Sequence, residues 1–153
     1  MTLHPGHQRH LQMELAGSQA GRSRVEVTTL VAAMQADLAH PWSLAELAEI
    51  AHLSPSRRRQ LFVEILGMPP MAWLTLQRVR AMARTISATD TTIRQAAAEV
   101  GWMNQAHAAK QFRKLTWRSP TEYRAKVWSQ NEPVGICRWC GHPIKQPSSR
   151  ARG

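Results

Sequence analysis

Acidic residues, cysteines and long apolar runs are all scarce in this sequence of 153 residues, and each shortage narrows the possible functions. Only 10 acidic residues stand against 20 basic ones, which leaves a formal net charge of +10 at pH 7. No apolar run approaches the roughly 20 residues that a membrane-spanning helix needs. A positive surplus in such a chain favours a polyanionic partner, and nucleic acid is the commonest one.

Catalytic groups are also missing in any recognisable arrangement. The sequence shows no paired carboxylates, no nucleophile with a nearby base and no glycine loop for phosphate. A chain of this length has no room for a sizeable two-domain enzyme. We therefore expect no enzyme activity. The start of the chain lacks the apolar core of a signal peptide, which predicts a cytoplasmic protein.

The two cysteines, Cys137 and Cys140, lie together in the segment CRWCGH. In a cytosolic chain this spacing indicates metal ligands or free thiols rather than a structural disulfide. A structural zinc ion takes four ligands, and only His142 is nearby, so others would come from histidines near the start or from a second chain. Two alternatives stay open: no cofactor, with an unmetallated basic tail that adds affinity for phosphate, and a redox pair.

Apolar residues recur at helical spacing along most of the chain, and no stretch alternates with period two. Residues 1–22 lack the helical period and are predicted to form a flexible leader. Residues 129–153, rich in Pro, Gly, Ser and Arg, are predicted to form a basic tail. The region 23–128 between them is predicted to be all-α. The predicted helices begin at Val25, Leu44, Pro55, Met71, about Ile93, about Asn104 and Pro120, and they end near His40, Ala51, Leu66, Ser87, Val100, Leu115 and Trp128.

Start and stop signals in the first half predict a helix-turn-helix. Ser43 is placed as an N-cap with Glu46 three residues on, which is the spacing of a capping box. Ser54 and the proline after it mark the start of a second helix only a short turn later. Gly67 is placed to end that helix, and the Pro-Pro pair at 69–70 prevents its continuation.

The pattern of this first unit returns in the second half of the chain. Chance similarity of helical hairpins in an Ala-rich chain is the alternative, but it would have to reproduce the same register twice. We interpret the repeat as two helix-turn-helix units, at about 23–70 and 90–128, joined by a linker helix at about 71–87. The matched pairs are Ala48 with Ala97, Phe62 with Phe112, Pro70 with Pro120 and Trp73 with Tyr123.

Three segments resemble the DNA-binding domain of the AraC/XylS transcription regulators. They are SLAELAEIAHLSPS, LFVEILGMPPMAWLTLQRVRAMA, and TTIRQAAAEVGW followed by QFRKLTWRSPTEYR, and the resemblance covers about Val25 to Lys126. It implies an all-α bundle of seven helices with two helix-turn-helix subdomains and a long connecting helix. It also implies a sequence-specific transcription regulator whose two recognition helices enter successive major-groove segments of double-stranded DNA, about one helical turn apart.

The resemblance also sets expectations about partners. Most members carry a further effector-binding domain, for which this chain has no room, so we expect a stand-alone unit without a small-molecule effector domain. We expect a monomer on DNA, with RNA polymerase as a further candidate partner. The alternative function is a DNA-binding accessory factor in recombination, replication or DNA architecture, without a direct role at promoters.

Polar and basic side chains of the two expected recognition helices are the candidates for contact with DNA. Arginine suits guanine and glutamine suits adenine in bidentate pairs, whereas other cations position the protein on phosphates. Each could instead be a solvated surface charge, and His107 fits a packing role equally well. The base-reading candidates are Ser56, Arg57, Arg59, Gln60, Asn104, Gln105, His107 and Lys110, and the phosphate candidates are Arg113, Lys114, Arg118 and Arg124.

Four residues depart from the pattern of the family. Arg58 stands where an apolar residue is usual, so we expect it to snorkel outward or to shift its helix. Trp117 and His52 stand where glycine is frequent, which predicts strain at His52. Ala108 replaces a larger aromatic residue, and we hypothesise that Trp117 fills the space it leaves.

Overall fold

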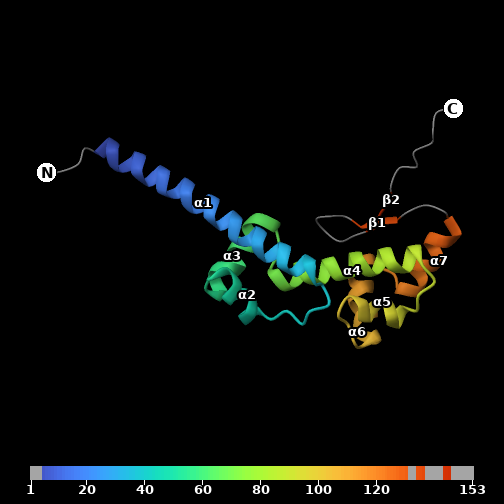
Figure 1. Ribbon diagram of the computed structural model, residues 1–153. Helices are drawn as coiled ribbons and strands as arrows, with labels where there is room; N and C mark the ends of the chain where they lie inside the picture. Colours follow the sequence, from blue (N-terminus) through green and yellow to red (C-terminus); the bar gives the residue numbers. More distant parts are fainter. Residues whose placement is uncertain (1–4, 131–133, 137–142, 146–153) are drawn as a thin grey trace, which may run out of the picture. The chain divides into compact units, whose positions relative to one another are not determined.

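The computed structural model describes the backbone of residues 5–130, 134–136 and 143–145 and the side chains of residues 20–129. This part of the chain contains seven α-helices and one two-stranded hairpin (Figure 1). The predicted all-α body is therefore confirmed. The elements are α1 (Pro5–Ala36), α2 (Leu44–Ala51), α3 (Pro55–Leu66), α4 (Pro70–Ala88), α5 (Ile93–Glu99), α6 (Gln105–Thr116), α7 (Pro120–Gln130), β1 (Val134–Ile136) and β2 (Pro143–Lys145).

The chain divides into two compact units. The first contains α1, α2 and α3 up to Pro70, and the second contains Asp37–Pro41 and the described residues from Met71 onward. In the first unit α1 packs against both α2 and α3, because Val27, Leu30 and Met34 form a buried stripe at helical spacing.

Helix α1 differs from the prediction at both ends. It begins at Pro5, not Val25, so residues assigned to a flexible leader have helical backbone. Once a packed segment nucleates a helix, further residues add backbone hydrogen bonds without needing an apolar stripe, and periodicity therefore misses them. The helix ends at Ala36 instead of near His40, because Asp37 Oδ1 accepts a hydrogen bond from the His40 N–H at 3.1 Å and turns the chain.

Arg78 of α4 fixes the connection that follows α1. Its Nε donates to the Leu38 carbonyl and its Nη2 to the His40 carbonyl, both at 2.8 Å. Burial lowers the pKa of Arg78, and the nearby Asp37 carboxylate opposes that shift. These bonds explain why Asp37–Pro41 belongs to the second unit.

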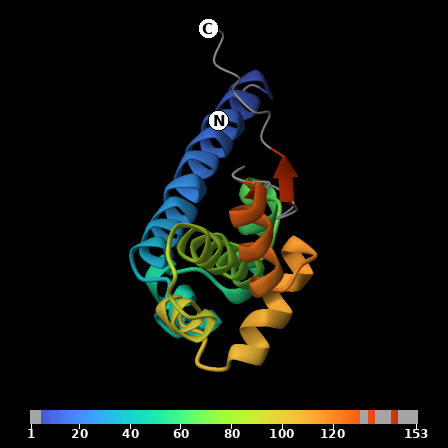
Figure 2. The same cartoon turned by 90° about the vertical axis from the view of Figure 1, so that its right-hand side faces the viewer.

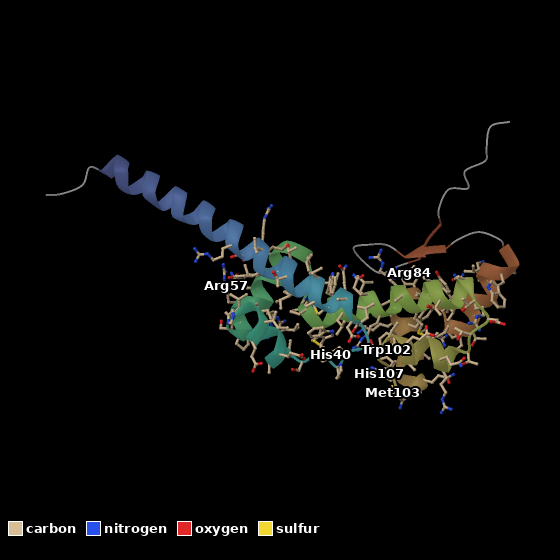
Figure 3. All side chains as sticks on the ribbon, in the orientation of Figure 1. His40, Arg57, Arg84, Trp102, Met103 and His107 are labelled. Atoms are coloured by element: carbon tan, nitrogen blue, oxygen red, sulfur yellow. The ribbon has the colours of Figure 1, made fainter. Side chains whose placement is uncertain are left out.

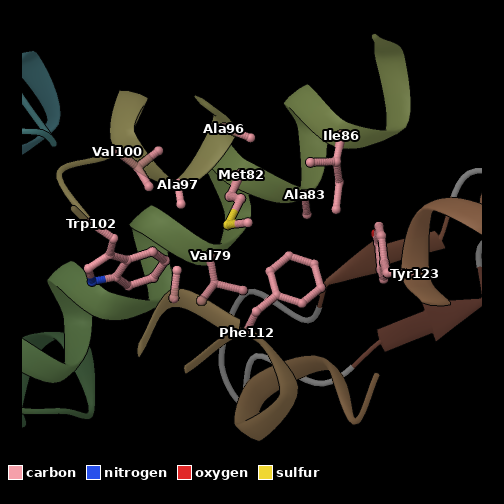
Figure 4. Packing of buried hydrophobic residues seen from close by; sticks show 11 residues of the cluster. Val79, Met82, Ala83, Ile86, Ala96, Ala97, Val100, Trp102, Phe112 and Tyr123 are labelled. Carbon is pink, nitrogen blue, oxygen red and sulfur yellow. The ribbon is translucent and has the colours of Figure 1, made fainter. Parts of the chain in front are cut away.

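The core of the second unit is built around α4. Val79, Met82 and Ile86 are fully buried, and α5, α6 and α7 gather around the helix (Figure 2). The predicted linker helix is thus part of the second unit's core. Phe112 and Tyr123 meet edge to face with ring centroids 5.3 Å apart (Figure 4), a geometry favoured by aromatic quadrupoles.

Backbone hydrogen bonds confirm the internal repeat. In the first turn, His52 N donates to Glu49 O and Leu53 N to Ala48 O; in the second, Gly101 N donates to Ala98 O and Trp102 N to Ala97 O. The N-caps also match in pairs. Ser43 and Thr92 cap α2 and α5, and Ser54 and Asn104 cap α3 and α6.

A hairpin that the sequence analysis did not predict follows α7. Strands β1 and β2 pair antiparallel, with Val134 opposite Lys145 and Ile136 opposite Pro143. Strands of three residues are too short to show a period-two pattern, which explains why this part of the tail gave no strand signal.

Candidate nucleic-acid interface

Helix α3 presents one polar face and one packed face. Leu61 and Phe62 are buried as expected, and the 3.6-residue period then places Ser56, Gln60 and Val63 along the opposite line. Ser54 caps the start of the helix, and its Oγ accepts from the Arg57 N–H at 3.3 Å. The predicted candidates on α3, namely Ser56, Arg57, Arg59 and Gln60, are all exposed.

Gln60 uses both ends of its amide within the helix. Its Oε1 accepts from Arg57 Nη1 at 3.2 Å, and its Nε2 donates to Glu64 Oε1 at 2.9 Å. A bidentate pair with adenine needs the same two groups. Contact with a base therefore requires Gln60 to exchange these internal hydrogen bonds, and Glu64 adds a negative charge to an otherwise basic face.

The expectation that the Arg58 side chain extends outward to solvent is wrong. Its side chain is 1% exposed, and Nη1 donates to the Leu44 carbonyl at 2.5 Å. Within the described residues its buried Nε has no hydrogen-bond partner. Burial lowers the pKa of the guanidinium, since low-dielectric surroundings disfavour the charged form. Arg58 thus occupies the apolar position and ties α3 to the start of α2, instead of shifting toward solvent.

Helix α6 repeats this arrangement with a more basic surface. Ala108, Phe112 and Thr116 are buried, which places Ala106, Lys110 and Arg113 along the opposite line. Gln105, His107 and Lys110 are exposed as predicted. His107 also makes an edge contact with Trp102, with ring centroids 6.4 Å apart, so both of its proposed environments fit.

Asn104, predicted to contact bases, also caps the start of α6. It lies before the helix as the N-cap, and its Oδ1 accepts from the His107 N–H at 3.0 Å. Removing such a cap typically costs about 1 kcal/mol. The side-chain oxygen of Asn104 is therefore already hydrogen-bonded to the first turn of α6.

Two of the phosphate candidates near the end of α6, Arg113 and Arg118, lie close enough to the Glu122 carboxylate to affect it electrostatically. Arg113 and Lys114 are exposed and Arg118 is half-buried. Glu122 accepts from the Ser119 N–H at 2.8 Å, and the Glu122 N–H donates to Ser119 Oγ at 3.2 Å, which forms a capping box for α7. These hydrogen bonds, with smaller effects of Arg113 and Arg118, lower the pKa of Glu122.

Arg124, predicted as a phosphate contact, also makes hydrogen bonds that stabilise the fold. Its Nε donates to the Ile86 carbonyl at 2.9 Å, and its Nη2 donates to the Thr91 carbonyl. The guanidinium carbon lies 5.3 Å from the ring centroid of Trp128. These bonds satisfy backbone carbonyls at the end of α4 and before α5, which sequence position alone could not reveal.

The hypothesis that Trp117 fills space beside Ala108 is wrong. Trp117 is 66% exposed, whereas Ala108 is fully buried in a cluster that includes Trp102 and Phe112. Trp117 instead follows α6 as its C-cap with φ of 60°, in the left-handed region. The expected strain at His52 is confirmed, because φ there is 53°.

The predicted metal ligands Cys137, Cys140 and His142 lie outside the described residues, so zinc at these positions stays a prediction. Among the residues whose placement is described, no group of three or more His, Cys, Asp or Glu side chains is suited to hold a metal ion. No helix in that same part of the chain combines the length and apolarity that crossing a bilayer demands.

Three exposed residues near the candidate faces escaped the sequence analysis. Ala106 and Val63 lie on the outward lines of α6 and α3, and Met103 is 85% exposed just before α6. The helical period counted back from Phe112 or Phe62 would have found the first two. Figure 3 labels Met103 and His107 in the region of α5 and α6.

Comparisons with known proteins agree with this geometry. The family described as "Helix-turn-helix domain" matches residues 47–126. The arabinose operon regulatory protein of Escherichia coli is 33% identical over 95 residues, which is 62% of this chain and 32% of that protein. The transcriptional activator RclR of Escherichia coli is 33% identical over 88 residues, 58% of this chain and 31% of that protein. The chain thus spans about a third of the length of these relatives.

A solved structure extends the likeness to the fold. The DNA-binding domain of the transcriptional factor AdpA, crystallised with a target DNA, superposes with a TM-score of 0.63 at 26% identity and covers 66% of this chain and 91% of that one. Two capped helix-turn-helix units, the family match and these relatives lead to one conclusion: the chain belongs to the AraC-type helix-turn-helix family of DNA-binding transcription regulators.

Proposed function

We propose that this chain regulates transcription by placing α3 and α6 in successive major-groove segments of one double-stranded DNA site. The observation that carries the proposal is the repeat itself. Each unit holds a capped helix of 12 residues with a buried stripe on one side and exposed polar or basic side chains on the other. An α-helix of this kind fits the major groove, where base edges differ for every base pair.

The charges support different tasks for the two faces. Lys110 and Arg113 give α6 an outward line with two cations, whereas α3 combines Arg57 and Arg59 with the Gln60–Glu64 hydrogen bond. We assign base reading to Arg59, Gln60 and Lys110, and phosphate contact to the exposed cations that follow Lys110 on α6. RNA polymerase remains the proposed further partner, and a monomer the proposed DNA-bound state.

Selection of binding sites from random double-stranded DNA tests the proposal. We expect an asymmetric site in two parts whose centres lie roughly 10 base pairs apart, because successive major-groove faces recur once per helical turn. Arg59→Ala should relax the preference in one part and Lys110→Ala in the other. Arg22→Ala, which removes the same charge from an exposed position on α1, serves as the matched control.

Two outcomes separate this function from the alternative. A two-part site near a polymerase-binding element, together with altered transcription in vitro, supports the regulator. Binding without a preferred sequence, which falls steeply as salt rises, would favour an accessory DNA-binding factor, because phosphate contacts alone release counterions without reading bases.

A further inference from the structure

Met103 is the most exposed of the large apolar side chains in the described part of the chain. It is 85% exposed, compared with 66% for Trp117 and 65% for Val25. It directly precedes Asn104, the N-cap of α6. Its neighbours Gln105 and His107 are polar and exposed, so Met103 places a long apolar side chain beside polar ones at the start of a candidate recognition helix.

The repeat identifies Met103 as an extra residue. Leu53 in the first turn and Trp102 in the second make the matching hydrogen bonds, to Ala48 O at 3.2 Å and to Ala97 O at 2.9 Å. In the first unit the N-cap Ser54 follows Leu53 at once. In the second unit Met103 intervenes before the N-cap. The second turn therefore contains one residue with no counterpart in the first.

Both flanks of Met103 are fixed. Gly101 has φ of 90°, which favours glycine. A Cβ added there would lie 2.6 Å from the Ala39 carbonyl oxygen, so this turn packs directly against the backbone of Ala39. Trp102 is 6% exposed in the core cluster, and it anchors the residue before Met103. Asn104 anchors the residue after it through the hydrogen bond to the His107 N–H. The backbone thus presents Met103 outward.

We propose that Met103 is a specificity-determining residue of the second unit that contacts the 5-methyl group of a thymine. The inference rests on the proposed function, because it assumes that α6 enters the major groove. Within that groove the thymine methyl is the apolar group displayed on base edges. A thioether side chain is flexible and polarisable, so it adapts to such a group.

Thymine-to-deoxyuridine replacement tests the contact, since it removes the methyl group alone. Each thymine in the part of the selected site that depends on Lys110 is replaced singly, and the Kd is measured for the unaltered protein and for Met103→Ala. We expect one replacement to weaken binding of the unaltered protein by about fourfold, the factor expected for one buried methyl group. The same replacement should have no effect on Met103→Ala.

Three controls sharpen the result. Val25→Ala, which removes exposed apolar surface from α1, should keep the full response to the missing methyl. Met103→Gln, of similar length but polar, should lose it. Met103→Ala should leave the melting temperature unchanged and the salt dependence of binding unchanged, because the contact involves no charge, whereas Lys110→Ala should reduce the salt slope by about one.

The outcomes distinguish this inference from the function on which it rests. If no preferred sequence is selected at all, the proposed function fails and takes the inference with it. If a two-part site is selected but no thymine methyl matters, or if the methyl matters equally in Met103→Ala, the contact is refuted while the function stands.

Discussion

The first helix-turn-helix unit has its glycine after the second helix, and the second unit has its glycine in the turn between the helices. In the first unit Gly67 follows α3 with φ of 76° and His52 occupies the turn with φ of 53°. In the second unit Trp117 follows α6 with φ of 60° and Gly101 occupies the turn with φ of 90°. Each unit thus has one non-glycine residue in the left-handed conformation at the position where the other unit has glycine, which adopts that conformation without strain.

The comparison shows that the left-handed turns are imposed by packing and not by local preference. His52 and Trp117 adopt a conformation that costs about 1–2 kcal/mol for a residue with a Cβ. The hydrogen bonds around them nevertheless match those around Gly101 and Gly67. Burial of the stripes that contain Phe62 and Phe112 outweighs the strain, because a fully buried Phe contributes about 1.5–3 kcal/mol.

The largest effect is expected at Gly101. Gly101→Ala should destabilise the protein by about 3 kcal/mol or more, because the new Cβ would meet the Ala39 carbonyl oxygen at 2.6 Å in addition to the strained φ. Gly67→Ala is the matched control, since nothing lies within 4 Å of its added Cβ. It should cost only about 1 kcal/mol. Urea unfolding followed by circular dichroism measures both, and equal losses would contradict the steric argument.

Arg58 offers the next largest effect, with the opposite sign. Arg58→Leu should raise the free energy of unfolding by about 1–2 kcal/mol, because it replaces a buried guanidinium whose Nε lacks a partner within the described residues. The bond to the Leu44 carbonyl is lost, which reduces the gain. A loss of stability would indicate that this bond outweighs desolvation. Thermal unfolding at constant pH provides the measurement.

The two strained residues should respond alike to glycine. Trp117→Gly and His52→Gly are each expected to stabilise the protein by roughly 1 kcal/mol, because glycine adopts positive φ without steric cost. If packing of the Trp117 side chain stabilises the fold, Trp117→Gly would lose stability whereas His52→Gly would still gain it. Comparing the two variants in the same denaturant titration separates backbone strain from side-chain packing.

A smaller, pH-dependent difference is expected where the following helices start. Glu122 caps α7 and has a lowered pKa, whereas Ala72 holds the matching position at the start of α4. The contribution of Glu122 is present above the ordinary glutamate pKa, about 4.3, and is lost as pH falls through the lowered folded-state pKa. Glu122→Gln should therefore lower the stability near pH 7, where the charged carboxylate contributes, and flatten the stability profile in the acid range, where the unaltered protein loses that contribution.

Prediction from sequence succeeded where local spacing determines structure. The capping positions of Ser43 and Ser54, the helix end at Gly67 and the inward direction of Phe112 all follow from residue type and the helical period. Those signals are sufficient for the two helix-turn-helix units and for the exposure of most candidate DNA-contacting residues.

Sequence reasoning did not find the hydrogen bonds that join a side chain to a partner far along the chain. Arg124 binds the carbonyls of Ile86 and Thr91, and Arg58 binds the carbonyl of Leu44. Nothing in the local sequence distinguishes such arginines from solvated ones, because the choice depends on which carbonyls the fold leaves within reach. The exposure of Trp117 could not be predicted either, because it depends on which segments the fold packs beside it.

By itself, the order of residues determined the repeat and the helices of the two helix-turn-helix motifs, because apolar periodicity and caps are properties of neighbours along the chain. Only the tertiary structure decided that Arg124 supports the fold and that Met103 faces solvent. Burial and hydrogen-bond partners arise from segments distant in sequence, and their free energies exceed the preferences of any single residue.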